Sequence, residues 1–160
     1  MPMDTAPARP LVTWSFRISA VLWVVWGLVH VTAGILTLKA TGSGQTVDAV
    51  HGIASAVDVA SVTLDYPAAV TAILAQHGFN LLWFGAVTLV SAPFVWRRRS
   101  LAVYLAALVG GLADMGYFLF IDLGDLALPP GPQMTWICAA AIISGFAALY
   151  VRSKTNQRTT

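Results

Sequence analysis

The chain has 160 residues, of which 58% are hydrophobic and only 10% are charged. Soluble domains carry about 25% charged residues, so lipid must cover most of this surface, and the length suits one domain. The net charge of +2 and the absence of Glu exclude a basic nucleic-acid-binding surface and a di-iron site built on Glu ligands. The single cysteine, Cys138, excludes an internal disulfide.

The first predicted element is a membrane-spanning helix over residues 18–38. Arg17 precedes 21 residues without a charge, and about 20 residues at ~1.5 Å each cross the hydrocarbon core. This run is longer than the core of a secretory signal, and the residues from Lys39 onward make a poor cleavage site, so we expect the helix to be retained. The proline-rich segment up to about Leu11 is expected to be disordered.

The longest polar connection follows, and it contains a short amphipathic segment after a flexible break at residues 41–44. On a helix, one face of this segment holds Val47, Val50, Ala54 and Val57. The opposite face holds Asp48, His51, Ser55 and Asp58. We expect this segment to lie on the bilayer surface or to cap the bundle, with its polar face in solvent and not on a metal ion.

Three further membrane-spanning helices are predicted over residues 68–96, 101–121 and 133–151. Pro67 stands where the first of these begins, a place that proline favours, and Pro93 is expected to kink or end it. An arginine hairpin and a proline-rich acidic loop connect the three helices. The polar tail after the last helix is expected to fray.

The distribution of basic residues predicts an orientation in the membrane. Eight of the nine Lys and Arg lie in the N-terminal segment, in the hairpin at residues 97–99 and in the C-terminal tail, and only Lys39 lies in the other two loops. By the positive-inside rule, both termini are expected in the cytoplasm, and the acidic loops are expected outside.

His30, His77 and Asp114 are ionisable side chains within three of the predicted spans. Counted from the outer end of each helix, all three lie roughly 12–15 Å below the outer surface. Because polar groups in hydrocarbon need partners, we expect these three side chains to touch one another in one polar layer. Asn80 shares a helical stripe with His77, and Tyr117 shares one with Asp114, so both are expected in the same layer.

Small residues are expected to bring the helices close together at this layer. Gly27 and Gly34 share a stripe of the first helix with His30, and Gly110 shares one with Asp114. Glycines at such positions let the backbones of membrane helices approach closely.

The sequence leaves three interpretations of the polar layer open. In the first, Asp114 makes one hydrogen bond, to a histidine or to Tyr117, and only fixes the bundle. In the second, the layer lines a pocket in the outer half that binds a small apolar or amphipathic molecule. In the third, His30 and His77 hold a haem, or they form a zinc site with Asp114. The lack of an HExxH pair speaks against zinc, and the lack of an outer arginine speaks against haem.

Two stretches carry a family resemblance. Residues 17–38, with Gly-Leu-Val-His-Val-Thr-Ala-Gly at their centre, resemble the first helix of small bacterial four-helix membrane proteins of the DoxX-like kind. The Phe-x-x-x-Trp-Phe-Gly motif of residues 79–85 is similar to the second helix of related families without an assigned function. The resemblance implies a four-helix bundle in a bacterial inner membrane, and it transfers no catalytic residues.

The predicted architecture is all-α: a single membrane domain over residues 1–160, folded as an antiparallel four-helix transmembrane bundle with a short amphipathic segment between helices 1 and 2. The leading functional hypothesis is a non-enzymatic protein that binds a small ligand or supports a membrane-protein partner or a second copy of itself. The alternative is a haem- or metal-binding subunit of a membrane oxidoreductase. The lipid bilayer is the expected environment, and nucleic acid is not an expected partner. The expected pocket is lined by His30, His77, Asn80, Asp114 and Tyr117.

Overall fold

The computed structural model describes residues 8–62 and 66–157, and four long apolar helices account for most of them. These helices are α1 (Ala8–Gly42), α3 (Ala68–Trp96), α4 (Ser100–Tyr117) and α5 (Gly131–Gln157). Each is long and apolar enough to cross a membrane, α4 together with the turn that follows it. The predicted all-α four-helix bundle is confirmed, and the described residues contain no strand.

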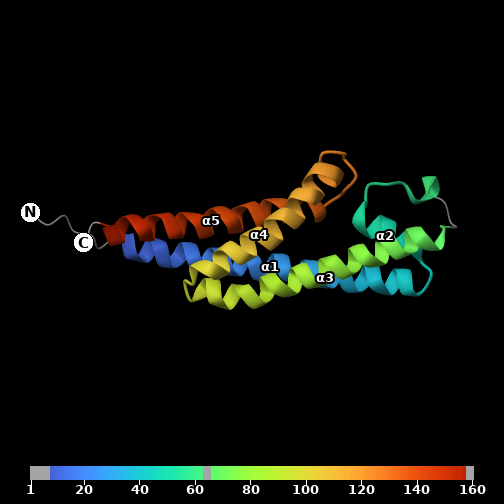
Figure 1. The fold of residues 1–160 in the computed structure, drawn as a ribbon. Coiled ribbons are helices and arrows are strands. Elements are labelled where there is room, and N and C mark those ends of the chain that lie inside the picture. The colour runs from blue at the N-terminus through green and yellow to red at the C-terminus, as the bar shows by residue number, and fades with distance from the viewer. Residues whose placement is uncertain (1–7, 63–65, 158–160) are drawn as a thin grey trace, which may run out of the picture.

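α1 and α3 form a long antiparallel pair that runs through the whole bundle (Figure 1). Glycines set the spacing of this pair. A Cβ atom at Gly34 would come within 2.6 Å of the backbone nitrogen of Leu82, and one at Gly85 would come within 2.6 Å of the carbonyl oxygen of Gly27. Because no side chain separates the two backbones at these points, the helices approach as closely as small-residue membrane interfaces allow.

α4 and α5 complete the bundle at the end that holds both chain termini (Figure 1). The core of this half is built on α1, whose Phe16, Trp23 and Trp26 are fully buried. Small residues of the other helices, such as Ala106 and Ala141, pack around these rings. Ser19 of α1 also donates a hydrogen bond of 2.7 Å to the carbonyl oxygen of Ala141 in α5.

The other half of the bundle is open between its helices. α4 passes into a π-helical turn, η2 (Phe118–Asp122), and this segment diverges from the α1–α3 pair (Figure 1). The short helix α2 (Thr46–Ile53) and the 3-10 turn η1 (Val59–Ser61) lie at this end of the molecule. The divergence leaves a space that α2 covers.

The structure corrects several predicted boundaries. α1 begins at Ala8, so the segment up to Leu11 is helical from Ala8 onward. The helix also runs to Gly42, two residues into the break expected at residues 41–44. α5 continues to Gln157, where the sequence predicted fraying after residue 151. Helical hydrogen bonding within each terminus explains both extensions, since nothing interrupts it there. Residues 1–7 and 158–160, also expected to be disordered, lie outside the described residues.

α2 and α3 also differ in detail from the sequence interpretation. α2 is only eight residues long, and it buries Thr46 and Ala49, whereas Val47 and Val50 of the predicted apolar face are only partly buried. The reason is a tertiary contact, because the Thr46 hydroxyl is hydrogen-bonded to the Thr71 hydroxyl of α3 at 2.9 Å. The bounds of α3 coincide with the predicted residues 68–96, and the helix continues past Pro93 to Trp96.

Candidate functional site

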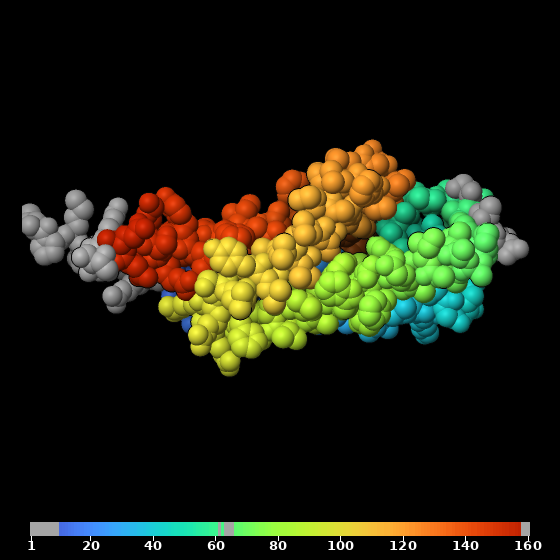
Figure 2. Space-filling model, viewed as in Figure 1, coloured from blue at the N-terminus to red at the C-terminus, as the bar shows by residue number. Residues whose placement is uncertain are grey.

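A cavity of about 670 Å³ lies in the half of the bundle where α4 diverges. In Figure 2 the surface is hollowed between the segment after α4 (orange) and α3 (green), next to α2 (teal). All five helices contribute to the lining of this cavity. Apolar walls are formed by Val29, Ala33, Leu36, Leu81, Ile53, Leu128 and Met134.

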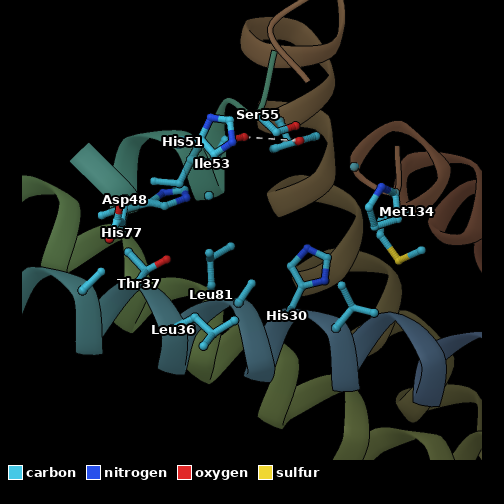
Figure 3. Close-up of a pocket in the computed structure, with 18 of the residues that line it drawn as sticks. His30, Leu36, Thr37, Asp48, His51, Ile53, Ser55, His77, Leu81 and Met134 are labelled. Carbon is cyan, nitrogen blue, oxygen red and sulfur yellow. Dashed lines mark hydrogen bonds between the residues drawn. The ribbon is translucent and has the colours of Figure 1, made fainter. Parts of the chain in front are cut away.

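His30 of α1 points into the cavity (Figure 3). Its Nδ1 lies 2.8 Å from the carbonyl oxygen of Trp26, one helical turn earlier. A carbonyl oxygen only accepts, so Nδ1 donates and Nε2 carries the ring's lone pair. The imidazole also stacks on the Trp26 ring, with centroids 3.5 Å apart and planes inclined by 19°. His30 is therefore held in one orientation and one tautomer, with an acceptor nitrogen left for the cavity.

Asp114 of α4 is the deepest charged group of the cavity, with only 4% of its surface exposed. Its Oδ1 accepts a hydrogen bond of 3.1 Å from Nε1 of Trp26, and Cys138 of α5 lies near the carboxylate. Asp114, Trp26 and His30 thus form a continuous chain of contacts from α4 to α1, which we call the Asp–Trp–His chain. The Asp–Trp–His chain holds these side chains in place at the inner end of the cavity.

A second polar group lies nearer the outer end of the cavity. His77 of α3 lines this region together with Asp48 and His51 of α2 (Figure 3). Lys39 and Gln45 line the same region. The cavity is therefore apolar along its walls and polar at both ends.

Hydrogen bonds join the cover of the cavity, which consists of α2 and the residues just after it, to the end of α4 and the loop that follows. The Tyr117 hydroxyl donates to the carbonyl oxygen of Ile53 at 3.4 Å. Just beyond α2, the amide of Leu128 donates to the Ser55 hydroxyl at 2.8 Å, and the amide of Ala56 donates to the carbonyl oxygen of Leu126 at 3.0 Å. The cover is thus joined to the bundle by polar contacts, which can open at lower cost than buried apolar packing.

Four of the five residues predicted for the polar layer line this one cavity: His30, His77, Asp114 and Tyr117. Asn80 does not line it, because its side-chain oxygen accepts a hydrogen bond of 3.1 Å from Nε1 of Trp83 on its own helix. Among the described residues, no hydrogen bond supports the expectation that the two histidines and Asp114 touch one another. Asp114 accepts instead from Trp26, and His30 Nδ1 lies against the Trp26 carbonyl.

The metal-binding alternative does not fit this arrangement. Among the residues that the structure describes, no three His, Cys or Asp side chains come close enough together to hold a metal ion, so the alternative zinc set of His30, His77 and Asp114 is not formed. A haem held from both faces needs two imidazoles opposite each other. His30 and His77 come from α1 and α3, which pack directly together, and they lie at separate points along the cavity (Figure 3).

Sequence reasoning missed residues that shape the site. Trp26 was not among the residues predicted for the polar layer, yet its Nε1 donates to Asp114. His51 and Asp48 were predicted to face solvent, and both are exposed, but they also line the cavity, which the sequence did not indicate. The i, i+3 spacing of these two residues was the only signal in the sequence, and it does not show which element they face.

The fold and the cavity define a class: a small multi-pass membrane protein with an internal, histidine-lined cavity at one end of its bundle. Comparison of the chain with family models, curated proteins and solved structures finds no match. The geometry of the cavity is therefore the basis of the functional argument.

Proposed function

We propose that this protein binds a small amphipathic molecule in the cavity between α2 and the divergent ends of the long helices. The observation that supports this most is the cavity itself. Its volume of about 670 Å³ lies within the ~300–1,000 Å³ typical of ligand sites, and a few polar groups converge on mostly apolar walls. Small-molecule sites have this composition because apolar walls supply affinity and polar groups fix orientation.

The chemistry of the inner end suggests which group the ligand carries. Nε2 of His30 is an acceptor in the tautomer that the Trp26 carbonyl selects. A hydroxyl or amine on the ligand would donate to this nitrogen, and an alkyl chain would lie against residues such as Leu81 and Met134. A purely apolar molecule would leave the acceptor unpaired, which costs roughly 1–3 kcal/mol of binding free energy.

The proposal predicts selective stabilisation by a long-chain alcohol. We expect 1-decanol to raise the thermal unfolding midpoint of the detergent-solubilised protein by about 3 °C at a concentration well above its dissociation constant, because it binds the folded state only. The alkane n-decane should raise the midpoint less. His30→Phe, which keeps a flat ring and removes the acceptor, should abolish the difference between the two compounds.

A pair of tryptophan variants controls for partitioning into the micelle. Leu81→Trp fills the cavity, whereas Leu112→Trp adds the same group on a face of α4 that is 60% exposed. The alcohol should lose its effect on Leu81→Trp and keep it on Leu112→Trp. Equal responses of these two variants, or equal effects of alcohol and alkane on the unaltered protein, would show that the cavity is not the binding site.

We also propose that the protein resides in a bacterial inner membrane with both termini in the cytoplasm. The bias of eight of nine basic residues toward the end that holds the termini supports this orientation. The resemblance of residues 17–38 to DoxX-like proteins is consistent with it and remains part of the proposal. The ligand cavity would then lie in the outer leaflet, within reach of molecules from outside the cell.

Reporter fusions test the orientation. Green fluorescent protein fused after Thr160 should fluoresce, and alkaline phosphatase at the same place should be inactive, because the first folds in the cytoplasm and the second needs an oxidising compartment. Alkaline phosphatase inserted after Ser61 should be active. The opposite pattern at the two positions would reverse the proposed orientation.

A further inference from the structure

The end of the bundle opposite the cavity carries a dense group of cations. Within the described residues this group, which we call the basic end, comprises Arg17, Arg97, Arg98, Arg99, Arg152 and Lys154. The helix ends that carry these residues meet at one end of the molecule (Figure 1). Anchoring tryptophans accompany them, since Trp14 is 59% exposed and Trp96 is 47% exposed.

No described acidic side chain neutralises the basic end. Four of the five described aspartates lie in the segments at the cavity end, and the fifth, Asp114, lies about 21 Å along α4 from Ser100. Across residues 8–62 and 66–157, none of the six cations forms an ion pair. The charges at this end therefore require counter-ions from outside the described chain.

Arg17 is held in place by aromatic rings. Its guanidinium carbon lies 5.3 Å from the ring centroid of Trp14 and 5.1 Å from that of Trp96, within the range of cation–π attraction. Because these two tryptophans come from α1 and α3, the contact fixes the cation between the helices. A cation at the level of interfacial tryptophans stands at the depth of lipid headgroups.

The hairpin between α3 and α4 is also fixed. Arg98 adopts a left-handed backbone conformation with φ of 61°, and its amide donates to the carbonyl oxygen of Val95 at 2.8 Å. Arg152 of α5 donates from Nη1 to the carbonyl oxygen of Arg98 at 2.7 Å, and its guanidinium lies 5.3 Å from the Phe16 ring. These contacts hold an arginine of α5 against the exposed arginines of the hairpin.

We propose that the basic end is a binding site for anionic phospholipid headgroups. Planar guanidinium groups donate in pairs to phosphate oxygens, and the side chains of Arg17 and Arg152, already held by their contacts, lose little entropy on binding. Basic clusters beside transmembrane helices attract acidic lipids, and each Lys or Arg near the surface adds to the attraction. This site is separate from the cavity and does not depend on the proposed ligand.

Lipid retention by the purified full-length protein tests the proposal. The probes are dioleoyl phosphatidylglycerol and dioleoyl phosphatidylcholine in mixed micelles, and native mass spectrometry counts the lipids that each protein retains. Phosphatidylglycerol should be retained and should raise the thermal unfolding midpoint by a few degrees, while phosphatidylcholine and inorganic phosphate at equal ionic strength should not. Retention should fall as sodium chloride screens the charges.

Charge-removing and charge-retaining variants complete the test. Arg97→Gln with Arg98→Gln and Arg99→Gln should weaken phosphatidylglycerol binding by on the order of tenfold or more, whereas the triple replacement by Lys should keep most of it. Lys39→Gln, a charge removed at the other end, should have no effect on it. Equal retention of both lipids, or undiminished retention by the Gln variant, would overturn the proposal. Salt-independent retention by the unaltered protein would overturn it even if the Gln variant failed to fold.

Discussion

Gly34→Ala is expected to lower the free energy of unfolding by about 3 kcal/mol, although alanine is normally the better helix former. The new Cβ would lie 2.6 Å from the backbone nitrogen of Leu82 and 2.7 Å from the carbonyl oxygen of Gly78. Backbone atoms within α3 cannot rotate away, so the two helices must move apart. That movement would weaken their packing over several turns on either side.

Gly116→Ala is the matched control for this prediction. A Cβ at Gly116 of α4 would meet no heavy atom within 4 Å, so the same substitution should be neutral or stabilising by up to about 1 kcal/mol. Unfolding of both variants by heat and by denaturing detergent, followed by circular dichroism, would measure the difference. If the two variants had the same stability, the close approach of α1 and α3 at Gly34 would be refuted.

The sequence sufficed to predict the elements that depend on local pattern. The apolar length between Pro67 and the arginine hairpin set the span of α3, and the spacing of Gly27 and Gly34 indicated a close helix contact. Membrane helices satisfy their own backbone hydrogen bonds, so apolar length alone nearly determines where they lie. The ends of α1 and α5 were missed because polar residues beyond the membrane do not stop a helix.

The site was only partly predictable, for a physical reason. Depth along each helix showed that His30, His77 and Asp114 belong to one half of the bundle, and they do share a cavity. Depth does not show rotation about the helix axis, so the actual partner of Asp114 could not be inferred. The position of α2 over the cavity depends on contacts such as Thr46 with Thr71, which link distant parts of the chain.

Asp114→Ala is expected to lower the free energy of unfolding by about 2 kcal/mol, because it leaves the indole donor of fully buried Trp26 without its acceptor. The Trp26 indole is buried at membrane depth, where no water replaces the lost acceptor, so hydration does not reduce this cost. Leu112→Ala is the control, since Leu112 lies on the same helix and is 60% exposed. Its replacement should cost well under 1 kcal/mol.

A double-mutant cycle separates the hydrogen bond from the other effects of the substitution. In a Trp26→Phe background the indole donor is absent, so Asp114→Ala should cost about 1 kcal/mol less than it does in the unaltered protein. An unchanged cost would mean that Asp114 acts through packing, and not through its bond to Trp26. The cycle also bears on binding, because His30 stacks on the ring that Asp114 holds. Loss of the carboxylate should therefore reduce the stabilisation by 1-decanol, even though Asp114 and His30 share no direct bond.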